Sequence, residues 1–137
     1  MKIFSKKVKY GLAALFELAK NYNMGFIQIK DIASKQNIPQ NYLEQLLSVL
    51  KKAGLVESMR GSQGGYKLSK AAEQIKIIDI IEALDGPLII SETSRSNEIL
   101  NIYWNQVETL FKNLFNDTLE KLVSEETILN KKLFFQI

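Results

Sequence analysis

Short polar side chains recur between residues 40 and 52 at the spacing of one helix face. Asn41, Gln45 and Ser48 are separated by four and three residues, so in a helix they lie on the same side. The other side carries leucines with the same periodicity: Leu43, Leu46, Leu47 and Leu50. A helix that buries leucines and exposes short amides and hydroxyls can hydrogen-bond to base edges in the major groove of DNA. An ordinary amphipathic surface helix has the same pattern, so the helix alone leaves both interpretations open.

A glycine-rich loop at residues 61–65, Gly-Ser-Gln-Gly-Gly, joins two short stretches at residues 55–60 and 66–68. This pattern is typical of a β-hairpin. Arg60 and Lys67 flank the loop, where a cation can approach a phosphate, and the glycines allow the backbone to come close to DNA. A tight hairpin without any ligand has the same residues. A nucleotide-binding loop is disfavoured, because the Walker spacing and its Gly-Lys-Ser/Thr ending are absent.

Four lysines, Lys2, Lys6, Lys7 and Lys9, are clustered at the start of the chain. They can pair with phosphates and give a salt-dependent affinity for nucleic acid, although a solvated chain end has the same composition. Residues 1–76 contain 13 Lys or Arg and 5 Asp or Glu, whereas the rest of the chain contains 5 and 10. A basic first half and an acidic second half favour a polyanion-binding unit joined to something else. Ordinary solvated surface is the alternative.

The chain contains no cysteine and no histidine. Disulfides, thiolate nucleophiles, histidine bases, zinc fingers and cysteine-ligated iron–sulfur clusters are therefore excluded. Asp79 and Glu82 lie three residues apart on one expected helix, but such acids usually form a solvated face, so we do not expect an enzyme. Glu17 and Lys20 interrupt the apolar start of the chain, and no stretch approaches the roughly 20 apolar residues of a membrane span. We predict a cytoplasmic protein that does not insert into a membrane.

The hydrophobic periodicity predicts a mainly helical chain with one small β-hairpin. Ser5 is the expected cap of a first helix that runs to about residue 20. The helices that we expect after it are at residues 30–36, 40–52, 78–84 and 97–116, followed by a short one ending near residue 123 and a tail at residues 130–137. Three helices followed by a glycine-tipped hairpin are the order of a winged helix-turn-helix. We predict that domain at residues 1–86, and a link, a long helix and the tail at residues 87–137.

The long helix predicted at residues 97–116 is apolar over a wide face. Its apolar residues are Ile99, Tyr103, Trp104, Val107, Leu110, Phe111 and Leu114. In a monomer these side chains would leave a large exposed patch. We therefore predict that this helix forms the interface of a homodimer.

Six short stretches of the sequence resemble the Rrf2 family of bacterial regulators, to which IscR, NsrR and CymR belong. These are residues 5–12, 41–46, 53–56, 60–66, 79–83 and 86–87, and the most specific are Tyr-Leu-Glu-Gln and Arg-Gly-Ser-Gln-Gly-Gly-Tyr. The resemblance implies a winged helix-turn-helix dimer whose long helices cross between the subunits. It also implies sequence-specific binding to a near-palindromic operator in double-stranded DNA.

The matched positions imply roles in DNA binding. The residues expected to contact the DNA backbone are Ser5, Lys6, Lys7, Lys9 and Gln28. Those expected in or over the major groove are Gln40, Asn41, Tyr42, Glu44 and Gln45. Those expected in the wing contact are Arg60, Ser62, Gly64 and Gly65. Val8 and Lys9 depart from the family pattern, where glycine and arginine are common. This departure affects the expected contacts with the DNA phosphates and not the expected fold.

Cluster-binding members of the family carry three cysteines after the position of Gly86-Pro87, whereas residues 88–103 contain none. The chain is therefore more similar to the cysteine-free branch typified by CymR, and we expect no cofactor. That resemblance implies sensing of sulfur status through a complex with cysteine synthase. The chain ends in Phe135-Gln136-Ile137, which is similar to the tail by which serine acetyltransferase docks in cysteine synthase. Phe135 and Ile137 are thus candidate docking residues, unless the tail packs on the long helix.

Two functions are consistent with these patterns. The first is a transcription regulator, most simply a repressor, that reads DNA without an iron–sulfur cluster. The alternative is a protein–protein adaptor that keeps the winged-helix scaffold and does not read DNA, since a fold alone does not establish a function.

Overall fold

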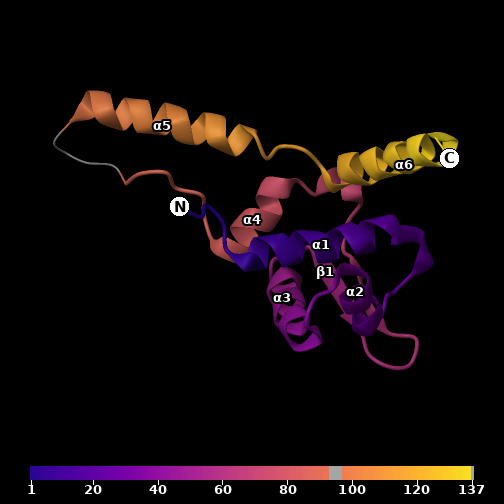
Figure 1. Cartoon of the computed structure of the whole chain (residues 1–137). Helices are drawn as coiled ribbons and strands as arrows, with labels where there is room; N and C mark the ends of the chain where they lie inside the picture. The colour runs from indigo at the N-terminus through magenta and orange to yellow at the C-terminus, as the bar shows by residue number, and fades with distance from the viewer. Residues whose placement is uncertain (93–96, 137) are drawn as a thin grey trace.

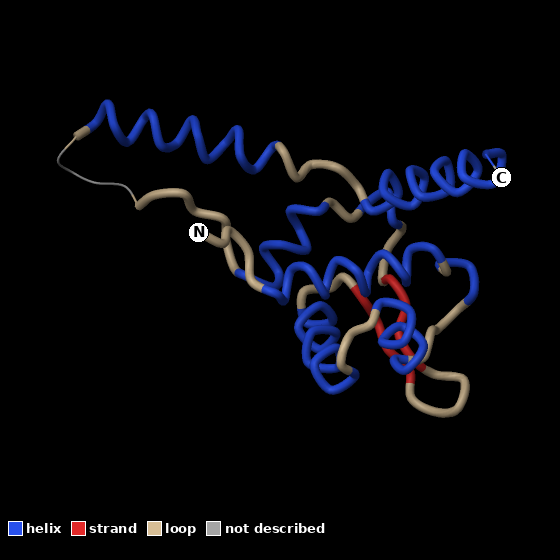
Figure 2. Tube along the Cα trace, viewed as in Figure 1, coloured by secondary structure: helices blue, strands red, loops and turns tan. Residues whose placement is uncertain are grey.

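The computed structural model describes residues 1–92 and 97–136. The elements are α1 (Lys6–Lys20), a 3-10 turn η1 (Tyr22–Met24), α2 (Ile29–Gln36), α3 (Gln40–Lys52), β1 (Val56–Met59), β2 (Gly65–Leu68), a 3-10 turn η2 (Ala72–Gln74), α4 (Ile77–Asp85), α5 (Glu98–Asn113) and α6 (Leu119–Gln136). The predicted mainly helical fold with one antiparallel hairpin is confirmed. Helix α5 stands away from the body formed by α1 to α4 and the hairpin, whereas α6 returns to lie over α1 (Figures 1 and 2).

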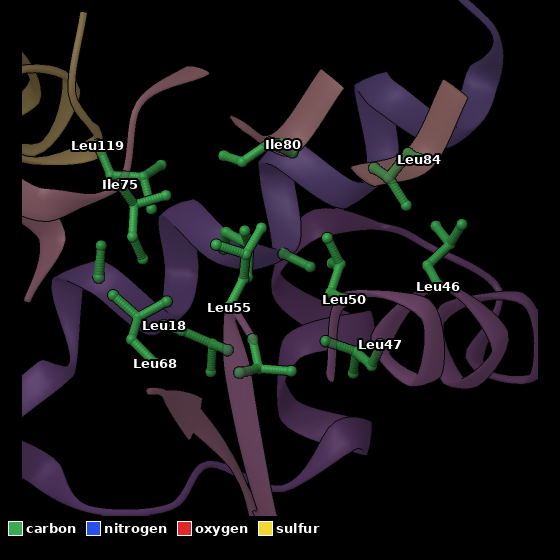
Figure 3. Packing of buried hydrophobic residues seen from close by; sticks show 14 of the residues in the cluster. Leu18, Leu46, Leu47, Leu50, Leu55, Leu68, Ile75, Ile80, Leu84 and Leu119 are labelled. Atoms are coloured by element: carbon green, nitrogen blue, oxygen red, sulfur yellow. The ribbon is translucent and has the colours of Figure 1, made fainter. Parts of the chain in front are cut away.

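Helix α1 is the centre of the core, because α2, α3, α4 and α6 all pack against it. Its buried side chains recur three to four residues apart, which is the spacing of one helix face. The largest fully buried side chains in the described residues are Leu15, Leu18, Ile32, Leu43, Leu47, Leu50, Ile75, Ile80 and Leu119. Figure 3 shows Leu119 beside Ile75, and the Leu119 amide donates to the Ile75 carbonyl at 2.9 Å. The first turn of α6 therefore belongs to the same core as α1, and each such leucine stabilises it by about 1.5–3 kcal/mol.

Helix α6 corrects our prediction for the end of the chain. We expected a helix ending near residue 123 and a separate tail, but α6 continues to Gln136. Residues 119–136 contain neither glycine nor proline, so no residue in this stretch breaks the helix. The Thr118 hydroxyl caps its start by accepting from the Lys121 amide at 3.2 Å. Ile137 lies outside the described residues.

Side chains cap the starts of α4 and α5, whereas the start of α1 has no side-chain cap. Asn97 caps α5 by accepting from the Leu100 amide at 3.2 Å, and the Asp79 carboxylate accepts from the Lys76 amide at 3.0 Å at the start of α4. Ser5 stands at the N-cap of α1, but its side chain makes no capping hydrogen bond. The predicted capping by Ser5 is therefore wrong, because its hydroxyl bonds to a carboxylate of α4 instead.

Within residues 1–92 and 97–136, no helix combines the length and the apolar character that crossing a membrane requires.

Gly11 lets α1 and α4 approach closely. A Cβ atom added there would lie 2.3 Å from Cδ1 of the buried Leu84. We expect Gly11→Val to destabilise the protein by about 1–3 kcal/mol through overpacking, measured by urea denaturation. In a Leu84→Ala background the same substitution should cost less, because the clashing atom is gone. An equal cost in both backgrounds would show that Leu84 is not the constraint.

Candidate nucleic-acid interface

Helix α3 presents the two faces that its sequence predicts. The leucine face is buried, and Asn41, Gln45 and Ser48 are exposed on the other side. Gln40 and Glu44 are exposed beside them. Tyr42 differs, because it is half-buried and its ring meets the ring of Tyr10 edge-on at a centroid distance of 5.7 Å. Tyr42 therefore ties α3 to α1, and Asn41 and Gln45 are the freer groups of the predicted base-reading set.

The turn between α2 and α3 fixes the direction of α3. Asn37 adopts a left-handed conformation, with φ 54° and ψ 51°, which asparagine tolerates better than most residues. Ile38 is buried, and its amide donates to the Ala33 carbonyl at 2.9 Å. Pro39 stands at the N-cap of α3, where its fixed φ suits a helix start. The two helices are thus joined by a turn that is held by both backbone conformation and burial.

The wing is the β1–β2 hairpin, in which Val56 pairs with Leu68 and Met59 pairs with Gly65. A Cβ atom on Gly64 would lie 2.1 Å from the Met59 carbonyl oxygen. The backbone of Gly65 has φ +140°, and a Cβ atom there would lie 2.2 Å from the Ile27 carbonyl oxygen. These two glycines are therefore required by contacts within the chain itself.

The wing is attached to the start of α2. Ile27 and Tyr66 exchange two backbone hydrogen bonds of 2.8 Å each, and Gln28 Nε2 donates to the Ser62 carbonyl at 2.9 Å. A shallow depression of about 310 Å³ brings together predicted site residues from α2, α3 and the wing: Gln28, Gln40, Gly64 and Gly65. Gln28 thus positions the wing loop, which is a role that the sequence did not reveal.

The cations of the wing have different environments. Lys67 pairs with Glu57 at 3.2 Å and lies 4.8 Å from the ring centroid of Phe26. Its charge is therefore already paired within the protein. Arg60 is exposed at the base of the loop and forms no ion pair within the described residues. Of the two cations that the sequence suggested, Arg60 is the one available to a phosphate.

Three exposed lysines lie at the start of α1: Lys6, Lys7 and Lys9. Within the described residues, none of them forms an ion pair. Ser5 lies next to them, with its amide donating to Asp85 Oδ2 at 3.0 Å and its hydroxyl donating to Asp85 Oδ1. The start of α1 is therefore fastened to the end of α4. No local pattern in the sequence connects two residues that are 80 positions apart.

The predicted interface helix α5 has no buried residue. Leu110 is 68% exposed, and Ile99, Tyr103, Trp104 and Leu114 are exposed as well. Val107 is half-buried. Phe111 is half-buried in an aromatic cluster, with centroid distances of 6.4 Å to Phe4 and 5.4 Å to Phe115. Phe111 thus contributes to the protomer itself, and the five exposed residues, with the half-buried Val107 among them, form a nearly continuous apolar face.

Comparison with known proteins identifies the family. A sequence profile of the Rrf2 family, described as an iron-dependent transcriptional regulator, matches residues 4–125. The chain belongs to the Rrf2 family. The HTH-type transcriptional regulator CymR of Bacillus subtilis is 40% identical over 126 residues, which are 90% of this chain and 91% of CymR. The regulator IscR of Erwinia tasmaniensis is 33% identical over 133 residues, which are 91% of this chain and 81% of IscR.

Solved structures of the Rrf2 family agree with this fold. The structure of CymR, the global cysteine regulator of B. subtilis, superposes with a TM-score of 0.82 at 38% identity and covers 91% of this chain and 98% of CymR. The structure of T. potens IscR superposes with a TM-score of 0.75 at 36% identity and covers 92% of this chain and 88% of IscR. The predicted family, its CymR-like branch and the winged-helix fold are confirmed.

Because the Rrf2 family is described as iron-dependent, the side chains of this chain that could bind iron are relevant. The sequence lacks cysteine and histidine, and the described residues contain no group of three or more Asp or Glu side chains placed to hold a metal. In the described part of the link, the Leu88 amide donates to Glu82 and the Ile90 amide donates to Glu108, each at 2.9 Å. The donor set of this chain therefore does not fit a cysteine-ligated iron–sulfur cluster.

Proposed function

We propose that this Rrf2 family member is a sequence-specific transcription repressor that binds a near-palindromic operator as a homodimer. The observation that carries the proposal is the exposed polar face of α3 next to an exposed Arg60 in the wing. Helix α3 and the hairpin loop project from the same side of the body, away from α5 and α6 (Figure 1). In this arrangement α3 enters a major groove while the wing reaches the adjoining backbone.

The division of work between these groups follows from their chemistry. The amides of Asn41 and Gln45 can donate and accept in pairs, which suits base edges, with adenine as the preferred base. Arg60, Lys6, Lys7 and Lys9 can neutralise phosphates, and such contacts position the protein without reading sequence. Gln28 supports the wing and, in this proposal, also approaches the backbone.

The homodimer is proposed because of the open apolar face of α5. A second copy covers this face and places two recognition helices on one side of the duplex, so that the operator has the two-fold symmetry of the protein. This proposal assigns a cytoplasmic location, where bacterial DNA is found.

Two substitutions separate the contacts that position the protein from the contacts that read sequence. We expect Arg60→Ala to weaken binding to all duplexes alike and to reduce the slope of log K against log salt by about 1. Asn41→Ala should instead cost about 1–3 kcal/mol on the operator and relax the preference at one base position. Fluorescence anisotropy with operator and scrambled duplexes at several salt concentrations measures both.

Lys121→Ala is the matched control for Arg60→Ala, because it removes the same charge from α6, where Lys121 pairs with its sequence neighbours Asp117 and Glu125. It should leave the salt slope nearly unchanged. If Arg60→Ala and Asn41→Ala both left the affinities unaltered, the adaptor function would be favoured over DNA reading.

B. subtilis CymR is a global cysteine regulator, and the proposal extends regulation by cysteine to this chain, with cysteine synthase as the sensing partner. Phe135 is 82% exposed on α6, which leaves it available to a partner. Because α6 is helical up to Gln136, docking of Ile137 in a narrow active site requires the last turn of α6 to unwind. Removal of residues 134–137 should abolish binding to cysteine synthase in calorimetry and leave binding to DNA intact.

A further inference from the structure

Glu17 is the buried charged residue of the described core, with 4% of its surface exposed. Its Oε1 accepts from Gln36 Nε2 at 2.6 Å and lies 3.1 Å from Lys20 Nζ. Its Oε2 is buried and has no hydrogen-bond partner among the described residues. A buried carboxylate is tolerated only when it is paired, so Glu17 depends strongly on Lys20 and Gln36.

Gln36 connects this carboxylate to the helix-turn-helix. It is the last residue of α2 and directly precedes the left-handed Asn37 of the turn into α3. The bond to Glu17 therefore fastens the end of α2 to the last turn of α1. Any change in the environment of Glu17 acts on the turn that sets the direction of α3.

Lys20 connects the same carboxylate to α6. Its Nζ lies 3.2 Å from Glu126 Oε1 as well as 3.1 Å from Glu17 Oε1. Burial lowers the pKa of Lys20, but its hydrogen bonds to Glu17 and Glu126 outweigh that effect and raise the pKa above its ordinary value. Lys20 is thus a fully charged bridge between a buried carboxylate of α1 and a surface carboxylate of α6.

Glu126 marks the place where α6 leaves the body. Before it, Leu119 is buried and Leu122 and Val123 are half-buried, whereas every residue from 127 to 136 is exposed. The outer half of α6 projects beyond the end of α1 (Figure 1). A molecule that binds the projecting half and tilts α6 therefore acts first on the Lys20–Glu126 bond.

We propose that the series of contacts Glu126–Lys20–Glu17–Gln36 couples the position of α6 to the helix-turn-helix, so that displacement of α6 lowers operator affinity. With α6 docked, Lys20 is held beside Glu17, and Gln36 keeps the α2–α3 turn in place. With α6 displaced, Lys20 is released to solvent and Glu17 is left buried with less compensation, which loosens the turn. This coupling rests on the DNA-binding function proposed above, and it provides the two states that an allosteric effect requires.

Two adjacent glutamates provide a matched pair of variants. Glu126→Gln breaks the bond to Lys20, whereas Glu125→Gln removes the same charge one residue earlier, where the carboxylate faces Lys121 of its own helix at 4.0 Å. Their general electrostatic effects on DNA binding are therefore the same. Because an exposed ion pair is worth little, we expect Glu126→Gln to raise the operator Kd about 2- to 5-fold relative to Glu125→Gln. The salt dependence should be equal in the two variants.

A second background tests whether the effect runs through Glu17. Glu17→Gln keeps an acceptor for Gln36 but removes the buried charge that needs Lys20. In this background Glu126→Gln and Glu125→Gln should give the same operator affinity, because the coupling has been removed. Equal affinities of the two variants in the wild-type background, or an unchanged difference in the Glu17→Gln background, would overturn the proposal.

Hydrogen exchange distinguishes failure of this coupling from failure of the proposed function. The Ile38 amide, which bonds to Ala33 at 2.9 Å, reports on the α2–α3 turn without any DNA. We expect it to exchange about 2- to 5-fold faster in Glu126→Gln than in Glu125→Gln. Suppose that the Ile38 amide exchanges faster in Glu126→Gln, but that neither the wild-type protein nor the variants select a DNA sequence. The coupling of α6 to the α2–α3 turn then stands, and the DNA-reading function fails. If the exchange rates are equal, the coupling fails.

Discussion

Leu110→Asp should convert the protein into a monomer and weaken its binding to a full operator by about 100-fold or more. Leu110 is 68% exposed in the protomer and touches no part of the core, so the substitution leaves the fold of one chain unaffected. In the proposed dimer it buries an unpaired carboxylate between two α5 helices, which costs far more than the interface gains from one leucine. The operator affinity falls because two linked half-site contacts become separate binding events.

The experiment for α5 combines sedimentation with operator binding at micromolar protein. Asn105→Asp is the control, because it adds the same charge to an exposed polar position of α5 and should leave the mass and affinity nearly unchanged. Circular dichroism should show equal helix content in both variants. A Leu110→Asp protein that sedimented as a dimer, or a monomer that bound the operator as tightly as the wild type, would refute α5 as the interface.

Gly65→Ala should detach the wing from α2. Its Cβ would lie 2.2 Å from the Ile27 carbonyl, and its φ of +140° is unfavourable for any L side chain. Relief of the clash requires the loss of the two 2.8 Å hydrogen bonds between Ile27 and Tyr66. We expect a loss of about 2–4 kcal/mol in the free energy of unfolding, from strain and broken hydrogen bonds together. Operator affinity should fall about 10-fold, because Arg60 is no longer held near the backbone.

Gly61→Ala is the matched control for the wing. Its φ is +108°, but no atom lies within 4 Å of the added Cβ, so only backbone strain of about 1 kcal/mol is expected. Urea denaturation gives the stability of both variants, and anisotropy gives their affinities. Similar losses in the two variants would mean that the close approach to Ile27 does not fix the wing.

The parts of this fold that have strong local signals could be predicted from the sequence. Helix α3 has the predicted bounds, because Pro39 precedes its first turn and Gly54, with φ +80°, lies just after its C-cap residue Ala53. The hairpin was predicted from its glycines. No strand boundary differs from its prediction by more than one residue, and shifts of that size are usual for element ends.

Contacts between distant segments could not be predicted. Ser5 with Asp85, Gln28 with Ser62 and Glu17 with Gln36 join residues that no periodicity connects. Such contacts depend on how α1, α2 and α4 are packed, and a hydrophobic pattern states only which face is buried.

Two candidate residues of the site also make contacts within the protomer that the sequence did not indicate. Tyr42 and Phe111 belong to the predicted DNA-contacting and dimer sets, yet each packs against an aromatic side chain of the chain itself, Tyr10 and Phe4. An aromatic ring at helical spacing is compatible with either environment. The length of α6 was underestimated because its apolar and charged residues are not separated clearly into two faces.

Selection of bound duplexes from a random pool, at moderate salt and with the purified full chain, tests the central claim most directly. The proposed function predicts an enriched near-palindrome whose half-sites lie about one helical turn apart, and Asn41→Ala should change the preferred base at one position in each half. A pool that stays random with the wild-type protein, or an enriched motif that Asn41→Ala leaves unaltered, would contradict sequence reading by α3.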